Sequence, residues 1–316
     1  MNAVVVPKFV LGTAQLGMDY GRVNRTGKPT RPTSISMLRH AIARGVTFLD
    51  TARAYGEAEW LIGEALAENW RLQATVITKF DLTGLNEGAA ASDVYARVDA
   101  GIEVSCRALG TQKLDTLLLH NWAHRDMWRG AAWQRLREHQ AAGKISKLGA
   151  SVYQPREALA ALADPAIQHL QIPTNILDRR WKLLDQAFAR RPDVIVHARS
   201  ALLQGILAQP AVCWPSVPRF DAEGCVRKLR TLADTFERDG VADLCLAYVR
   251  SLPWIAGVVV GCETMEQVER NIELFARPTL HAEAIQELED ALPGAPEDLL
   301  NPGKWDLVAQ MVVCAS

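Results

Sequence analysis

The segment 47–66, TFLDTARAYGEAEWLIGEAL, contains the pattern that decides the fold. It begins with a short, strongly apolar run that stops at Asp50, as expected for a strand buried on both faces. Five apolar residues then recur at helical spacing and form one stripe: Ala58, Leu61, Ile62, Ala65 and Leu66. The segment therefore predicts a β-strand followed by an amphipathic helix.

The same unit, a short apolar run followed by a helical pattern, recurs along the chain. We predict eight strands, at residues 9–12, 47–50, 75–79, 116–120, 147–152, 170–172, 194–198 and 257–261. Further helices are predicted at residues 93–109, 128–142, 155–163, 224–239 and 264–276. Another helix is expected around Leu38 and Ile42, with Thr33 or Ser34 as its N-cap and Gly45 as its stop.

Eight strands that alternate with helices in 316 residues predict one α/β domain over residues 1–316. We expect a (β/α)8 TIM barrel, a closed parallel sheet with its active site at the C-terminal ends of the strands. An open doubly wound sheet is the alternative. Its usual glycine-rich turn, GxGxxG, is absent after the first strand, where residues 12–17 read GTAQLG.

The composition excludes several classes of partner. Lys and Arg number 35 against 36 Asp and Glu, so no basic excess indicates binding to nucleic acid or to an anionic membrane. The N-terminus lacks the pattern of a signal peptide, and no stretch approaches the ~20 apolar residues of a membrane span. The six cysteines are scattered and predict no metal site. We expect a cytoplasmic protein that acts on a small molecule.

Polar residues end three successive predicted strands. The second strand ends at Asp50, the third at Lys79 and the fourth at His120. Each alone is compatible with a local role, such as helix capping by Asp50. Together they lie where barrel enzymes place their chemistry, and Tyr55 follows shortly after the first of them. The three strand ends therefore predict a functional site.

These motifs resemble those of the aldo-keto reductases. The resemblance rests on GTAQLG, LDTARAYGEAEWLIGEAL, ITK and LLLH, and it extends from Leu11 to about Asn271. It implies an NAD(P)-dependent oxidoreductase, with NADP(H) or NAD(H) as cofactor, that interconverts a carbonyl group and an alcohol. The family's catalytic tetrad would be Asp50, Tyr55, Lys79 and His120.

The chemistry explains these residue types. Reduction of a carbonyl adds a hydride to carbon and a proton to oxygen, and Tyr55 would be the general acid or base for that proton. The ordinary pKa of tyrosine, ~10, makes it a weak acid, and we expect the Lys79 ammonium to lower that pKa. Asp50 would pair with Lys79, and His120 would orient the substrate oxygen.

The resemblance also assigns a cofactor site, with two departures. Ser151 and Gln171 would hold the nicotinamide carboxamide, but Val152 stands where the family usually has Asn. After the seventh strand the family commonly shows Tyr-Ser-Pro-Leu, with the aromatic ring stacked on nicotinamide, whereas residues 199–202 read RSAL. A guanidinium would then replace the ring, or Arg199 would meet a phosphate or an anionic substrate. The assigned cofactor residues are Thr13, Ser151, Gln171, Arg199, Ser200, Leu202, Gly261, Glu263, Gln267 and Asn271.

The choice between NADP and NAD stays open at this point. Family precedent favours NADP, and amides at the start of the helix after the eighth strand would face phosphate. Glu263 stands where NADP-preferring members often have a cation. Because a carboxylate repels a 2′-phosphate and accepts a hydrogen bond from a 2′-hydroxyl, Glu263 favours NAD.

Two loops are candidates for substrate binding. Residues 18–28 contain Tyr20 and Arg22, and Trp122 follows His120. Indole walls with polar edges suit sugars. The first loop and the RSALLQG turn resemble a bacterial subgroup found in surface-polysaccharide or sugar-modifying settings. The substrate is thus expected to be an aldehyde, a ketone or a sugar.

Two alternatives to a reductase remain from the sequence. One is a redox-neutral sugar epimerase or dehydratase that retains its cofactor, which the departures at Val152 and Arg199 would allow. The other is a non-catalytic regulatory subunit that binds a nicotinamide nucleotide. The intact tetrad argues against the second. The oligomeric state stays open.

Overall fold

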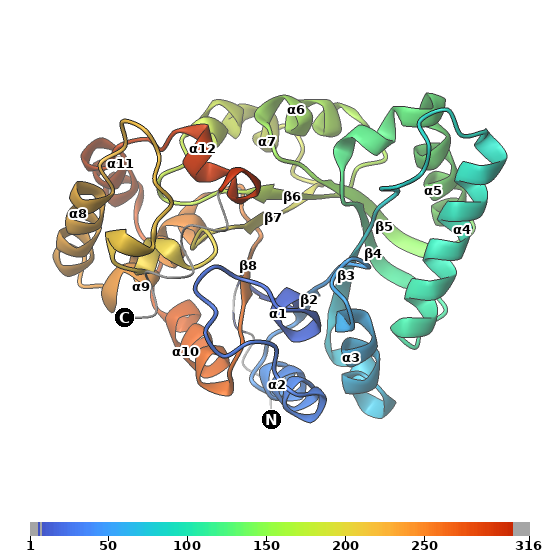
Figure 1. Ribbon diagram of the computed structural model, residues 1–316, viewed down its shortest axis with the longest axis horizontal. Helices are drawn as coiled ribbons and strands as arrows, with labels where there is room; N and C mark the ends of the chain where they lie inside the picture. Colours follow the sequence, from blue (N-terminus) through green and yellow to red (C-terminus); the bar gives the residue numbers. More distant parts are fainter. Residues whose placement is uncertain (1–5, 7, 306–316) are drawn as a thin grey trace.

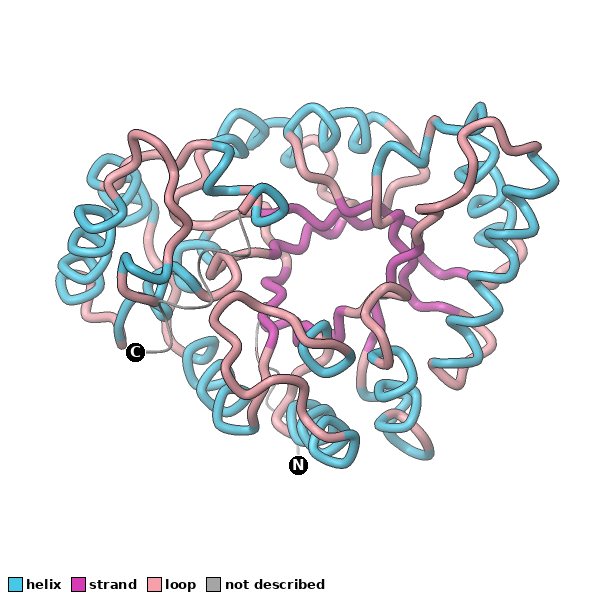
Figure 2. The backbone as a smooth tube through the Cα atoms, in the orientation of Figure 1, coloured by secondary structure: helices cyan, strands magenta, loops and turns pink. Residues whose placement is uncertain are grey.

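Eight parallel strands close into a barrel in the computed structural model, which describes residue 6 and residues 8–305 (Figures 1 and 2). Each strand pairs with its neighbour in sequence, and β8 closes the ring by pairing with β1. The predicted TIM barrel is therefore confirmed. The strands are β1 (Phe9–Gly12), β2 (Phe48–Asp50), β3 (Thr75–Phe80), β4 (Leu114–Leu119), β5 (Ile145–Ser151), β6 (His169–Pro173), β7 (Ile195–Arg199) and β8 (Gly257–Gly261).

Helices surround the barrel and cover its outer face (Figure 2). They are α1 (Ala14–Gly17), α2 (Arg31–Ala43), α3 (Ala58–Ala65), α4 (Ala91–Ala108), α5 (Ala131–Ala141), α6 (Pro155–Ala163), α7 (Asp185–Ala189), α8 (Ala222–Thr235), α9 (Gly240–Ser251), α10 (Met265–Ala276), α11 (Ala282–Ala291) and α12 (Glu297–Leu300). In the described part of the chain, none of them has the length and apolar character to cross a bilayer.

Several helix ends differ from the prediction. The N-cap of α2 is Thr30, whose hydroxyl accepts from the Thr33 amide, so the predicted caps Thr33 and Ser34 lie inside the first turn. Helix α5 begins at Ala131 rather than at residue 128, because Trp128 and Arg129 adopt left-handed φ angles of 52° and 54°. Helices α9 and α11 were not predicted.

Two layers of side chains fill the barrel. Residues two apart on a strand point to the same face, so each inward residue has a partner one layer higher. The lower layer packs Val10, Ile77 and Leu118 with Phe48 and Val259. Two buried histidines complete it: the ring of His197 lies 4.4 Å from that of His169 and 5.4 Å from that of Phe48, centroid to centroid.

The upper layer consists of the residues two positions further along the strands. Its members are Gly12, Asp50, Lys79, His120, Ser151, Gln171, Arg199 and Gly261. All of them except Lys79 line one cavity, and Lys79 is buried just below it. The strand alternation thus separates a packing layer from a polar layer at the carboxyl ends of the strands.

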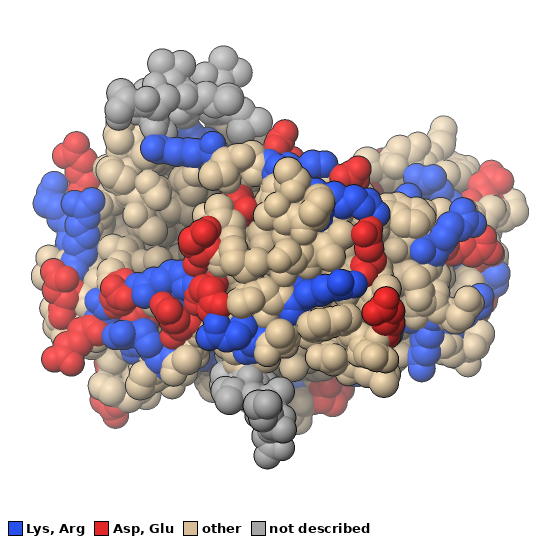
Figure 3. All heavy atoms as spheres, turned by 90° about the horizontal axis from the view of Figure 1, so that it is seen from below, with Lys and Arg blue, Asp and Glu red and all other residues tan. Residues whose placement is uncertain are grey.

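Charged side chains of both signs are interspersed over the face seen in Figure 3. The sequence carries 35 basic and 36 acidic residues, and this view shows the two kinds side by side rather than in separate regions. The surface in this view therefore has no resemblance to the continuous basic stripe expected of a nucleic-acid binder.

Candidate active site

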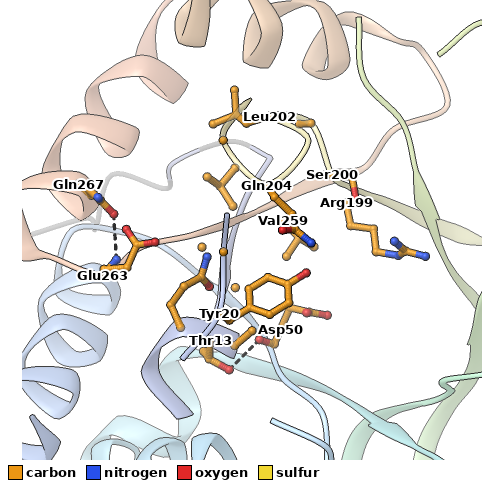
Figure 4. A pocket seen from close by; sticks show the side chains of 18 of the residues that line it. Thr13, Tyr20, Asp50, Arg199, Ser200, Leu202, Gln204, Val259, Glu263 and Gln267 are labelled. Atoms are coloured by element: carbon orange, nitrogen blue, oxygen red, sulfur yellow. Dashed lines mark hydrogen bonds between the residues drawn. The ribbon is translucent and has the colours of Figure 1, made fainter. Parts of the chain in front are cut away.

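A cavity of about 720 Å³ opens at the carboxyl ends of the strands. Figure 4 shows its wall, with Tyr20 and Asp50 toward the barrel centre and Glu263 and Gln267 toward one end. Gly12 and Gly261 are the members of the upper layer without a side chain, and they leave room in the wall. A Cβ on Gly261 would lie 2.1 Å from the Gln15 amide oxygen, so a larger residue there would displace the Gln15 side chain.

Lys79 and Asp50 form a buried ion pair at the base of the cavity. The Lys79 Nζ lies 2.8 Å from Asp50 Oδ1, 2.7 Å from Oδ2 and 2.8 Å from the Thr51 carbonyl oxygen. An ammonium group has three hydrogens to donate, so these bonds use all of them. Burial lowers the pKa of Lys79, and the Asp50 carboxylate opposes this change. Gln171 Nε2 donates a further bond of 2.6 Å to Asp50 Oδ1.

Tyr55 and His120 lie side by side above this pair. Their ring centroids are 5.8 Å apart at an interplanar angle of 82°, and Lys79 Nζ is 5.1 Å from the centre of the Tyr55 ring. Burial, followed by the Lys79 ammonium, lowers the pKa of His120 to about 4. His120 is therefore a neutral imidazole near pH 7.

The expected lowering of the Tyr55 pKa by Lys79 is not found. Burial raises the pKa of Tyr55 above its ordinary value of 10.0, and the Asp50 carboxylate raises it further. Asp50 offsets the charge of Lys79, whose hydrogens are all donated elsewhere. The positive charge that does act to lower the Tyr55 pKa belongs to Arg199.

The residues assigned to nicotinamide come together on β5, β6 and β7. Ser151 and Gln171 are register partners and both line the cavity. The Gln171 amide nitrogen is bonded to Asp50, which leaves its oxygen to accept. Thr13 also lines the cavity, but its hydroxyl donates to the Asp50 carbonyl oxygen at 2.9 Å. Arg199 lies with its guanidinium 4.2 Å from the ring centre of Tyr153.

The residues assigned to the adenosine end line the cavity at the start of α10. Gln267 Oε1 accepts from the Glu263 amide at 2.8 Å, a bond drawn in Figure 4, and Thr264 caps the helix. Asn271 Nδ2 lies 3.2 Å from Cys262 Sγ. Ser200, Leu202 and Gly261 also line the cavity. That the amides at this helix start face a phosphate stays a prediction.

The sequence predicted that Arg22 and Trp122 bind the substrate, but neither residue lines the cavity. Arg22 turns away: its Nε donates to the Cys213 carbonyl oxygen at 3.4 Å, and its guanidinium lies 5.3 Å from the Trp305 ring. Trp122 is 8% exposed and packs in the hydrophobic core, because the short 3-10 turn after β4 folds it inward. Tyr20 does line the cavity.

The structure adds residues that sequence reasoning missed. Tyr153 and Gln204 line the cavity near Tyr20, and Glu266 and Arg270 line the adenosine end. Tyr153 could have been predicted as a cavity residue, because it follows the assigned Ser151 by two positions. Arg270 was on the face of a predicted helix that also carries Gln267. Gln204 belongs to the RSALLQG turn noted in the sequence, but its place in the cavity wall was not predicted, because the loop after β7 folds through left-handed φ angles at Leu203 and Gln204.

The loop after β1 crosses the cavity to meet the loop after β7. Val23 and Gly205 both line the cavity, and a Cβ built on Gly205 would lie 2.3 Å from Val23 Cγ2. Gly21 approaches Glu263, whose Oε1 would be 3.7 Å from a Cβ at Gly21. In Figure 1 the dark blue segment between α1 and α2 reaches toward the yellow segment after β7. We call residues 18–28 the crossing loop.

The family model described as "Aldo/keto reductase family" matches residues 8–293. The chain belongs to the aldo-keto reductase family. The resemblance noted in the sequence is therefore confirmed, as is the prediction of an NAD(P)-dependent oxidoreductase. The sequence of this aldo-keto reductase is 28% identical to norsolorinic acid reductase of Emericella nidulans over 93% of the chain and 80% of that protein. It is 25% identical to protein tas of Escherichia coli over 90% of the chain and 94% of that protein.

Solved structures of the family share the fold of this aldo-keto reductase. The holo form of an aldo-keto reductase from Bacillus halodurans superposes with a TM-score of 0.70 at 21% identity, covering 91% of this chain and 93% of the other. An aldo/keto reductase from Klebsiella pneumoniae, solved in complex with NADP and acetate, gives 0.66 at 21% identity, covering 98% of this chain and 100% of the other.

Proposed function

We propose that this aldo-keto reductase reduces the carbonyl group of a small molecule, with Tyr55 as the proton donor. The observation that carries the proposal is the arrangement at the cavity base, where Tyr55 lies beside a neutral His120 and above the buried Lys79–Asp50 pair. Two expectations from the sequence remain predictions: that residues 1–316 form one domain, and that the protein is cytoplasmic.

The residues present fit a nicotinamide nucleotide. A cavity of about 720 Å³ lies within the range of ~300–1,000 Å³ that is usual for ligand pockets. The N-terminus of α10, which follows the cavity-lining Glu263, offers a helix dipole to phosphate. Ser151 and the free oxygen of Gln171 would hold the carboxamide, at the Tyr55 end of the cavity.

A bound reduced nicotinamide would supply the hydride to the carbonyl carbon. The Tyr55 hydroxyl would donate its proton to the carbonyl oxygen, and His120 would donate a hydrogen bond to the same oxygen. The products are the alcohol and the oxidised nucleotide. The phenol is protonated at neutral pH, as a proton donor must be, and burial raises its pKa above the ordinary value.

The substrate end of the cavity supports an oxygen-rich carbonyl compound. Tyr20 and Tyr153 offer aromatic faces with hydroxyl edges, and Gln204 adds an amide. Such a wall suits the C–H faces and hydroxyls of a sugar. The proposal of a sugar now rests on these residues and on the sequence resemblance, since Trp122 lies outside the cavity wall.

The proposal is tested by Tyr55→Phe, with Tyr153→Phe as the matched control from the same cavity. Oxidation of NADH and NADPH is followed with a panel of aldehydes, ketones and sugars. Loss of the acid should lower the rate on the order of 10²–10⁴-fold while the nucleotide dissociation constant stays nearly unchanged. Tyr153→Phe removes a hydroxyl from the substrate wall rather than the acid, so it should raise the KM for sugars while kcat stays close to the wild-type value.

A Tyr55→Phe variant that keeps more than a tenth of the wild-type rate would contradict the role of Tyr55. Stoichiometric loss of the reduced nucleotide distinguishes the reductase from a redox-neutral epimerase or dehydratase, which would return it unchanged.

A further inference from the structure

The cavity wall contains two basic side chains within the described residues, Arg199 and Arg270, and their surroundings differ. Arg270 forms ion pairs with Asp239 and Glu273. Arg199 forms no ion pair with any carboxylate in the part of the chain that the structure describes. It donates to the Val152 carbonyl oxygen at 3.4 Å and stacks on Tyr153. Its charge is therefore not neutralised by a neighbour.

Arg199 lies close to the residues that we propose take part in the reaction. It ends β7 in the upper layer of the barrel, two strands from Ser151 on β5 and one strand from Gln171 on β6. Its positive charge acts on the ionisation of Tyr55 and of His120, in both cases toward a lower pKa. The other cation near this point, Lys79, is offset by Asp50. The net charge around the reacting atoms is therefore positive.

Hydride transfer requires the nicotinamide ring to lie beside the carbonyl carbon whose oxygen Tyr55 protonates. Reacting atoms must approach to roughly 3–3.5 Å, so the ring has to enter the same part of the cavity as Arg199. When the hydride leaves, the ring changes from neutral to a single positive charge, and the substrate carbon gains the electron pair. A fixed cation beside the ring then raises the free energy of the oxidised form alone.

We propose that Arg199 makes the enzyme discriminate between the two redox states of its nicotinamide nucleotide, binding the reduced form more tightly than the oxidised form. Arg199 acts on the nicotinamide ring through its positive charge and takes no part in proton transfer. The inference rests on the proposed function and adds how the nucleotide is exchanged: the enzyme holds the reduced nucleotide and releases the oxidised nucleotide readily, while the same charge makes the bound hydride donor weaker. Tyr153 holds the guanidinium in place through its ring face.

The experiment measures dissociation constants of the reduced and the oxidised nucleotide by titration of intrinsic tryptophan fluorescence. The proteins are the wild type, Arg199→Gln, which removes the charge, and Arg199→Lys, which keeps it. Arg270→Gln is the matched control, because it removes a charge from the same cavity at the end where both redox forms are identical. The quantity of interest is the ratio of the oxidised to the reduced dissociation constant.

We expect the wild type to favour the reduced form and Arg199→Gln to lower the ratio about tenfold. A tenfold change corresponds to a shift of ~30 mV in the two-electron potential of the bound nucleotide. Arg199→Lys should stay within about threefold of the wild-type ratio. Arg270→Gln should change both constants by the same factor and leave the ratio unaltered.

An Arg199→Gln ratio within twofold of the wild type overturns the inference and leaves the proposed function intact. So does an Arg199→Lys ratio that falls as far as that of Arg199→Gln, since shape rather than charge would then be responsible. A protein that binds neither nucleotide overturns the proposed function and the inference together. Arg199→Tyr, a second neutral variant, gives the same measurement should Arg199→Gln fail to fold.

Discussion

At the scale of single residues, the hydrogen bonds of Lys79 determine how strongly it can act on Tyr55. All three ammonium hydrogens are donated, two to Asp50 and one to the Thr51 carbonyl. Lys79 therefore has no hydrogen left for the Tyr55 hydroxyl, and its charge is largely offset by Asp50. The sequence could predict that these residues lie together, because each ends a strand. It could not predict the direction of the Tyr55 pKa, which depends on burial and on the carboxylate beneath.

The carboxylate of Glu263 gives a prediction about nucleotide choice. Glu263→Arg should improve binding of NADP relative to NAD roughly tenfold, because a cation replaces an anion near the expected 2′ position. Both dissociation constants are measured at one ionic strength. Glu273→Arg is the control, since it makes the same change of charge on α10 and pairs with Arg270 on the exposed side. A ratio that stays within twofold of the wild type would remove Glu263 from the nucleotide site.

At the scale of elements, the longer helices predicted from an apolar stripe are present, whereas α9, α11 and the irregular segments were not predicted. The predicted stripe of five residues from Ala58 to Leu66 corresponds to α3 and its C-cap. The start of α5 was misplaced because Trp128 and Arg129 take left-handed φ angles, for which their residue types give no signal. The crossing loop was recognised as a candidate site, but its course depends on a bond between Arg22 and Cys213, 191 residues apart.

The contact between the crossing loop and the loop after β7 is testable by mutation. Gly205 has a φ of +88°, and a Cβ there would lie 2.3 Å from Val23 Cγ2. Gly205→Ala should therefore destabilise the fold by ~1–3 kcal/mol and speed nucleotide release, since the loops are pushed apart. Stopped-flow dissociation and urea unfolding measure the two effects.

The double variant Gly205→Ala/Val23→Ala provides the control for this clash. Removal of the Val23 methyl groups should restore the wild-type rate of nucleotide release, whereas the backbone strain at position 205 should persist. Release from Gly205→Ala as slow as from the wild type would show that the two loops do not restrict exit of the nucleotide.

At the scale of the whole molecule, the closed barrel followed from eight repeated strand–helix units. The cavity did not follow in the same way. Its floor is set by strand ends that the sequence reveals, but its rim is made by loops from β1, β5, β7 and β8 that meet only in the folded chain. This explains why Asp50, Tyr55 and His120 were assigned together while Tyr153 and Gln204 were missed.

The buried histidines of the lower layer predict how the fold responds to acid. Burial lowers the pKa of His197 to about 3 and that of His169 well below 6.5. Between these values and the unfolded pKa of ~6.5, the unfolded chain binds more protons than the folded one. Stability should therefore decrease as pH falls below 6.5, by up to ~1.4 kcal/mol per unit for each histidine.

Urea unfolding from pH 7 to pH 4 checks this prediction. The variant His169→Leu/His197→Leu should lose less stability over this interval than the wild type, although carboxylates such as Asp99 keep part of the slope. Equal slopes for the double variant and the wild type would contradict the prediction.

The two-layer interior limits which changes of sequence such a barrel can accept during evolution. Because Ile77 and Lys79 share one face of β3, insertion of a single residue between them would turn Lys79 outward among the helices. The Asp50 carboxylate would then lose the ammonium group that pairs with it. Strands of this barrel should therefore tolerate substitution but not a change of length, and a diversified library that aims at new substrates should vary the loops and keep strand lengths constant.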